Sequence, residues 1–316
     1  MTQVQFLQVD ETHKIAYETI GSRQGIPLVF LHGGPGSGYS EASKSFFDTN
    51  LWFATFIDQR GCGKSTPNGC VVNNTTDDLI LDIEKIRKKI GVDRWVVFGG
   101  SWGSTLALKY TMTFPEKVHA LILRGVFLGT KEEIDWFVND MGKQKFPNTF
   151  ADLQQIVPKD MNILEYYYNT IFGNDRIKSV DATERWENLE RAGMQLSEEN
   201  LKFKGAVPQQ IEKKEETISE VKALNRMRIH LHYLKNNCFL RHNELIDNCN
   251  ILGERKVFIV QGSDDPICPK KHALKLHSHL KNSEIELVKN TGHDAFSPKL
   301  KNALTNALEK VRKELL

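Results

Sequence analysis

A serine, two neighbouring aspartates and a histidine stand along the chain in an order that suits nucleophilic catalysis. They are Ser101, which has a glycine two positions before and after it, then Asp264 and Asp265, and then His293. A serine hydroxyl attacks a carbonyl at neutral pH only when a base takes its proton and a third group orients that base. The sequence therefore predicts acyl transfer, with Ser101 as the nucleophile, His293 as the base and one aspartate as its partner.

The predicted nucleophile stands at a sharp turn between a strand and a helix. Residues 95–98 are apolar and rich in β-branched and aromatic side chains, which predicts a buried strand, and residues 105–110 suit a helix. Glycines at 99 and 103 let the two backbones approach closely, so that the serine hydroxyl is held exposed at the turn. The same pattern arises by chance around an idle serine, but the flanking strand and helix favour a nucleophile.

A glycine-rich loop, His32–Gly38, follows the apolar strand predicted at 27–31. Such a loop presents free backbone N–H groups to an anion. Neither phosphate-binding template fits, since Asp58 stands where a P-loop needs glycine before Gly63. We expect the loop to supply half of an oxyanion hole, with a plain turn as the alternative. The polar segment 58–65 is expected to support the site.

Strands and helices alternate on both sides of a helical segment. Strands are predicted at 4–9, 14–20, 27–31, 51–57, 95–98, 118–123, 256–261 and 284–288, and helices at 76–90, 131–141, 163–172, 182–194, 215–234 and 302–315. This alternation is typical of an α/β protein with a mostly parallel sheet. We expect residues 1–128 and 249–316 to form one catalytic domain and 129–248 a helical cap domain, with 198–216 exposed.

Composition excludes several classes of partner. The 316 residues carry a net charge of +2 with mixed signs, which does not favour nucleic acid. No apolar run is long enough for a membrane span, and residues 1–25 lack a signal-peptide core. The five cysteines lack CxxC spacing, which indicates reduced thiols in the cytoplasm and neither disulfides nor a zinc site. We expect no metal, no nucleic acid and no membrane partner.

Four motifs resemble the proline iminopeptidase (prolyl aminopeptidase) family of α/β-hydrolase serine peptidases. They are His32-Gly-Gly-Pro-Gly36, Asp58-Gln-Arg-Gly61, Gly99-Gly-Ser-Trp-Gly-Ser104 and Gly292-His293, and the likeness extends into the cap at 133–137, 146–147 and 185–187. The resemblance implies an α/β-hydrolase fold with an inserted helical cap. It also implies release of an N-terminal residue, preferably proline, from short peptides, with no cofactor.

The resemblance also implies roles for single residues. Ser101, His293 and Asp265 would form the catalytic triad, and the N–H groups of Trp102 and of a residue near Gly34 would form the oxyanion hole. In the family the acid usually follows Gly-Arg-Tyr. Here Ser-Asp replaces Arg-Tyr at 263–264, so the pocket wall beside the acid is expected to differ.

An aminopeptidase must bind a protonated amine, and a carboxylate does so through a charge-assisted hydrogen bond. The family uses two cap glutamates: Glu187 matches the first, and His230 stands where the second is expected. A histidine with the ordinary pKa of about 6.5 would become cationic at mildly acidic pH and repel the substrate amine. For Glu187 alone, the alternative is a solvated helix face.

Two other functions compete with the aminopeptidase. An esterase or amidase would use the same triad without any need for a free amine. A non-catalytic binding protein of the same fold would carry a damaged triad, whereas serine, acid and histidine are all present in the expected order.

Overall fold

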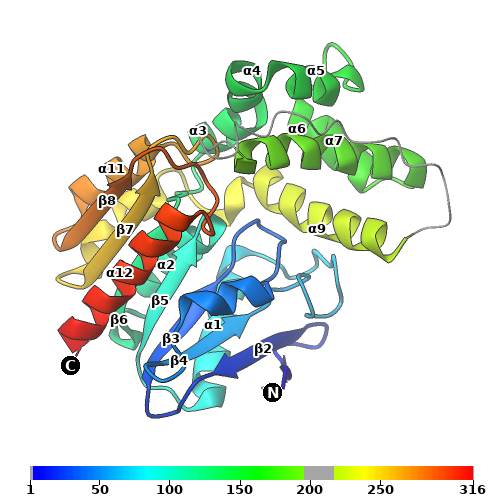
Figure 1. Ribbon diagram of the computed structural model, residues 1–316. Coiled ribbons are helices and arrows are strands. Elements are labelled where there is room, and N and C mark those ends of the chain that lie inside the picture. Colours follow the sequence, from blue (N-terminus) through cyan, green and yellow to red (C-terminus); the bar gives the residue numbers. More distant parts are fainter. Residues whose placement is uncertain (1–2, 196–216, 316) are drawn as a thin grey trace.

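An eight-stranded sheet forms the centre of the computed structural model, which describes residues 3–195 and 217–315 (Figure 1). The strands are β1 (Gln5–Gln8), β2 (Lys14–Ile20), β3 (Ile26–Leu31), β4 (Trp52–Ile57), β5 (Trp95–Gly100), β6 (Val118–Arg124), β7 (Lys256–Gly262) and β8 (Ser283–Val288), in the order β1-β2-β4-β3-β5-β6-β7-β8. β2 is antiparallel to both of its neighbours, β1 and β4, at one edge, and β3 to β8 run parallel. The predicted α/β class with a mostly parallel sheet is confirmed.

Helices cover both faces of this sheet. Successive side chains of a strand point to opposite faces, and in β5 Val97 packs with α1 (Thr76–Ile90) and α2 (Trp102–Thr113), whereas Val96 and Phe98 pack with α12 (Pro298–Leu315). The helix α11 (Lys270–His279) joins the α1 and α2 side. α1 matches its predicted bounds because Thr75 and Asp78 form a capping box at its start and Gly91 ends it.

The chain between β6 and β7 forms helices above the carboxyl end of the sheet (Figure 1). They are α3 (Lys131–Asp135), the π-helical turn η3 (Trp136–Asp140), α4 (Met141–Lys145), α5 (Pro147–Gln155), α6 (Ile163–Ile171), α7 (Arg176–Gln195), α9 (Ile218–Lys235) and α10 (Glu244–Asp247). The single helix predicted at 131–141 is therefore interrupted, and α5 was not predicted. Residues 198–216, expected to be exposed, lie outside the described ranges.

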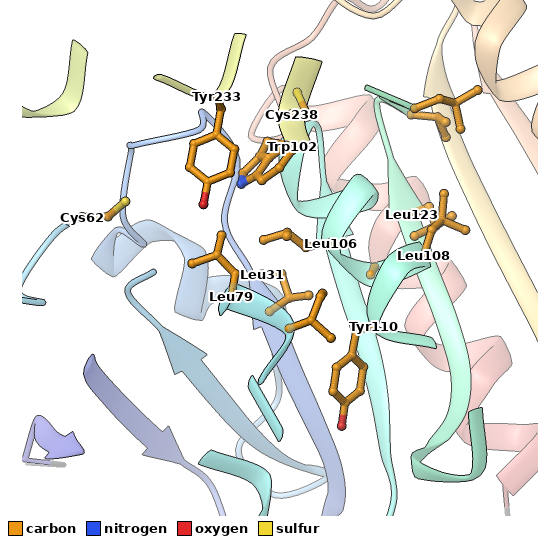
Figure 2. Packing of buried hydrophobic residues seen from close by; sticks show 14 of the residues in the cluster. Leu31, Cys62, Leu79, Trp102, Leu106, Leu108, Tyr110, Leu123, Tyr233 and Cys238 are labelled. Carbon is orange, nitrogen blue, oxygen red and sulfur yellow. The ribbon is translucent and has the colours of Figure 1, made fainter. Parts of the chain in front are cut away.

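The helix that follows Ser101, α2, packs against the helices above the sheet. Trp102, the first residue of α2, is fully buried, and its ring centroid lies 4.8 Å from that of Tyr233 on α9 (Figure 2). Leu31 of β3 and Leu106 of α2 belong to the same core cluster. The upper helices thus share one core with the strands beneath Ser101. None of the described helices is long and apolar enough to cross a bilayer.

Candidate active site

Ser101 occupies a strained turn between β5 and α2. Its φ of 56° lies in the left-handed region, which non-glycine residues rarely adopt. A Cβ on Gly99 would lie 2.1 Å from the carbonyl oxygen of Gly103, and a Cβ on Gly103 would lie 2.0 Å from that of Leu31. Any side chain at 99 or 103 would therefore separate backbones that must touch. The Ser101 N–H donates to the carbonyl oxygen of Arg124, on β6, at 2.8 Å.

Asp265 and His293 form a buried pair in the loops that follow β7 and β8. Asp265 Oδ2 accepts from His293 Nδ1 at 2.7 Å, and the two residues are 5% and 4% exposed. Asp265 Oδ1 accepts backbone N–H groups from Ile267 at 3.0 Å and Cys268 at 2.8 Å, which holds the carboxylate towards the ring. Asp264 is exposed, so only the second aspartate meets the histidine.

Ser101 and His293 lie at the same edge of the sheet, and both contact Arg124. Among the described residues, no hydrogen bond joins the Ser101 hydroxyl to His293 Nε2. Instead His293 Nε2 lies 3.2 Å from Arg124 Nη1, and the Arg124 carbonyl oxygen binds the Ser101 N–H. Arg124 thus contacts both Ser101 and His293.

The two segments expected to bind an oxyanion are joined by one side chain, that of Gln59. Its Nε2 donates to the His32 carbonyl oxygen at 2.9 Å, its backbone N–H donates to His32 Nε2 at 3.1 Å, and its Oε1 accepts from Trp102 Nε1 at 2.9 Å. Gly34 and Ser101 line the same cavity. The polar segment 58–65, predicted to support the site, thus holds the glycine loop against the start of α2.

The cavity beside Ser101 is small and mostly apolar. It is lined by Gly34, Pro35, Ser101, Phe127, Glu133, Ile134, Phe137, His230, Leu234, Ile267 and Cys268. Cys268 is buried, and burial raises the pKa of its thiol well above the ordinary value. Within residues 3–195 and 217–315, no three His, Cys, Asp or Glu side chains gather in a group that could hold a metal ion.

His230 lines the cavity and faces a glutamate that sequence reasoning missed. Its Nδ1 lies 3.3 Å from the Pro35 carbonyl oxygen, and its Nε2 lies 3.4 Å from Glu190 Oε1, on α7. Burial lowers the pKa of His230. Glu187 lies about one turn earlier on α7 and binds Arg226, not His230. The structure therefore brings Glu190, and not Glu187, to His230.

Arg226 bridges the two glutamates. Its Nη2 donates to Glu187 Oε1 at 3.0 Å and to Glu190 Oε2 at 2.5 Å. Burial acts to raise the pKa of Glu190, but the charge of Arg226 holds that pKa below its usual range. Both carboxylates stand on one side of α7, as their spacing of three residues requires. Which of them faces His230 depends on how α7 packs against α9, and no local signal predicts it.

Comparisons of the sequence and of the structure with known proteins agree on one family. Residues 26–300 match the alpha/beta hydrolase fold family. The chain is 36% identical over 310 residues to a proline iminopeptidase of Arabidopsis thaliana, covering 97% of this chain and 79% of that protein. A proline iminopeptidase of Neisseria gonorrhoeae is 34% identical, with 98% and 96% covered. The crystal structure of a proline iminopeptidase from Mycobacterium smegmatis has a TM-score of 0.65 at 15% identity, covering 99% of this chain and 100% of that one, a likeness of fold.

Proposed function

The chain belongs to the proline iminopeptidase family of α/β-hydrolases, and from that membership we propose that it releases N-terminal residues, preferably proline, from short peptides. The observation that carries the proposal is the buried pair of Asp265 and His293, 2.7 Å apart, beside a serine on a strained turn. A peptide with a free N-terminus is the substrate class that fits the family and the cavity.

The proposed reaction is acyl transfer. Ser101 Oγ attacks the carbonyl carbon of the N-terminal residue while its proton passes to His293 Nε2, and Asp265 stabilises the resulting imidazolium. The N–H groups of Trp102 and of the loop at Gly34 stabilise the oxyanion. The proton on His293 then passes to the nitrogen of the leaving peptide. Water next attacks the acyl-enzyme with His293 as its base, which frees the amino acid and restores the serine.

The cavity favours a small apolar first residue. Phe137, Ile134 and Leu234 supply apolar contacts suited to a pyrrolidine ring, and His230 supplies a polar group on the same wall. We propose that Glu190 joins Glu187 and His230 in the amine site, because Glu190 is the carboxylate nearest to His230. A neutral imidazole whose Nδ1–H faces the Pro35 carbonyl oxygen keeps the Nε2 lone pair free to accept an N–H from the substrate.

The upper helices have a proposed role in this specificity. We propose that residues 129–248 form a cap domain and that 1–128 with 249–316 form the catalytic domain. All eight strands belong to the second group, and His230 and Glu190 belong to the first. The five cysteines are unpaired, which supports the proposed cytoplasmic location.

The test compares substrates with and without a free amine. Prolyl naphthylamide should be hydrolysed, N-acetylprolyl naphthylamide should not, and Ser101→Ala should abolish turnover by several orders of magnitude with the fold intact. Equal rates on the free and acetylated amides would favour the esterase or amidase alternative. Turnover by Ser101→Ala above about a tenth of the wild-type rate would remove Ser101 as the nucleophile.

A further inference from the structure

Arg124, the last residue of β6, touches both residues that the proposed reaction requires. Its carbonyl oxygen accepts the Ser101 N–H at 2.8 Å. Its Nη1 donates to the His293 carbonyl oxygen at 3.0 Å and lies 3.2 Å from His293 Nε2. Nucleophile and base come from segments almost 200 residues apart, so a residue in contact with both is placed to set their relative position.

The guanidinium also lies against the backbone of β5 at Gly100. A Cβ built on Gly100 would lie 2.7 Å from Arg124 Nη2 and 3.0 Å from its Nε. The glycine before Ser101 is thus explained by the arginine that lies against it. Among residues 3–195 and 217–315, no carboxylate forms an ion pair with Arg124. Asp265 and Asp294 attract its positive charge and so act to raise the pKa of Arg124, but neither forms such a contact.

The contact with His293 has a chemical consequence. A guanidinium carries only donors, so His293 Nε2 must be the acceptor and its proton must lie on Nδ1, which faces Asp265. This is the tautomer that a general base needs when it takes a proton from serine. The positive charge of Arg124 also lies directly against the imidazole.

We propose that Arg124 is a positioning residue that holds His293 with Nε2 unprotonated and yields that lone pair to the Ser101 hydroxyl when substrate binds. The proposal rests on the proposed function only in taking Ser101 as nucleophile and His293 as base, and it is independent of the preference for proline. The ionisable groups around the contact are Asp265 and Cys268, in the loop after β7, and Asp294, next to the histidine.

The experiment measures the serine directly, without a peptide substrate. A fluorophosphonate reacts with an activated serine: Ser101 Oγ bonds to phosphorus, fluoride leaves, and the serine proton passes to His293. We would follow its rate from about pH 5 to about pH 9 for the wild type, Arg124→Met and Arg124→Lys. Arg94→Met, which removes a surface arginine from the opposite end of the sheet, is the matched control.

Arg124→Met should slow labelling by about tenfold or more and move the acid limb of the profile up by about one pH unit, because the charge that opposes protonation is lost. Arg124→Lys should keep the acid limb near that of the wild type, since it keeps the charge. Arg94→Met should change neither quantity. A folded Arg124→Met with an unmoved acid limb overturns the proposal.

A second variant keeps the test decisive if Arg124→Met does not fold. Gly100→Ala leaves Arg124 in the chain but forces its guanidinium off the backbone of β5. Gly100→Ala should move the acid limb of the labelling profile to higher pH, as Arg124→Met does. A folded Gly100→Ala protein with an unmoved acid limb overturns the proposal. Failure of the proposed function looks different, because the wild type itself would then react no faster than Ser101→Ala.

Discussion

His293 Nδ1 donates to Asp265 Oδ2 at 2.7 Å, while Asp264, one residue earlier, is exposed to solvent. The two aspartates are adjacent, so composition and spacing cannot separate them. The separation comes from the loop itself, in which the N–H groups of Ile267 and Cys268 bind the carboxylate of Asp265 and direct it to the imidazole. The two donors lie two and three residues after Asp265, the spacing of an Asx turn, whereas Asp264 stands one residue too early for it.

Replacement of each aspartate by asparagine should therefore have unequal effects. Asp265→Asn should lower kcat by about 10⁴-fold, because an amide no longer holds the imidazole in the required tautomer. Asp264→Asn, as the matched neighbour, should leave kcat within about threefold of the wild type. Steady-state rates on prolyl naphthylamide measure both. A larger loss in Asp264→Asn would reassign the acid.

Gln59 provides a test of the support under the oxyanion hole. Gln59→Leu removes the hydrogen bonds to the His32 carbonyl oxygen and to Trp102 Nε1, and so frees both segments that would bind the oxyanion. We expect kcat to fall by about tenfold or more with KM nearly unchanged, since the lost alignment matters chiefly in the transition state. Gln24→Leu, at an exposed position, is the control. A rise in KM with kcat intact would place Gln59 in substrate binding instead.

The parts of the fold with local signals were predictable from sequence. The strand before Ser101, the two elbow glycines and α1 depend on periodicity, backbone contact and capping, which lie within a few residues. β5 was predicted at 95–98 and runs from Trp95 to Gly100. The sheet followed from the alternation of strands and helices, and its parallel strands bring Ser101, Asp265 and His293 to one edge.

The parts that depend on distant segments were not predictable. The contact of Glu190 with His230 needs the packing of α7 on α9, and the bridge made by Gln59 needs three loops to meet. α5 was missed because its first residue, Pro147, follows a run with weak helical periodicity, although proline is well suited to the first turn. The first two cases are decided by tertiary contacts, and α5 by a local pattern too weak to predict a helix.

Cys268 should confer sensitivity to thiol reagents without taking part in the chemistry. It lines the cavity beside Ser101, but burial raises the pKa of its thiol, so reaction with a maleimide should be slow and should block the cavity once complete. Cys268→Ser should keep activity and lose the sensitivity. Rates before and after maleimide treatment measure both, with Cys70→Ser as a control outside the cavity. An inactive but folded Cys268→Ser would point to attack by sulfur.

His272, on α11, should make the fold less stable in mild acid. Burial, with the nearby Lys271 and Lys275, lowers its pKa to about 4. The unfolded imidazole takes up a proton near its ordinary pKa of about 6.5, while the folded one stays neutral, so the unfolded state binds more protons and stability falls as pH drops from about 6.5 to about 4. This residue alone should contribute a loss of up to about 2 kcal/mol between about pH 7 and about pH 5.

Urea unfolding at those two pH values measures the effect of His272. His272→Asn should lose less stability on acidification than the wild type, even if it is less stable at both values. His279→Asn, an exposed histidine on the same helix, should behave as the wild type does. An equal loss in the His272→Asn protein would show that other groups carry the acid sensitivity.

The last prediction concerns the proposed amine site and depends on the charge of His230. A histidine with its ordinary pKa would repel the substrate ammonium in mild acid, but burial lowers the pKa of His230, so the imidazole stays neutral there. In the proposed amine site, the substrate amine would meet one neutral acceptor, His230, and one carboxylate, Glu190, which Arg226 already binds at 2.5 Å. The KM for a free amine should therefore depend more on Glu190 than on Glu187.

Four proteins decide this: the wild type, Glu190→Gln, Glu187→Gln and His230→Glu, each assayed on prolyl naphthylamide and on nitrophenyl acetate, which has no amine. Glu190→Gln should raise KM for the amide by about tenfold, which is the loss of one charge-assisted hydrogen bond, and should leave the ester unaffected. Glu187→Gln should act in the same direction but more weakly, because Glu187 binds Arg226 and does not contact His230. His230→Glu should lower KM for the amide by adding a second carboxylate. A larger effect at Glu187 would restore the pairing predicted from sequence, and equal responses of the two substrates would mean that these residues do not bind an amine.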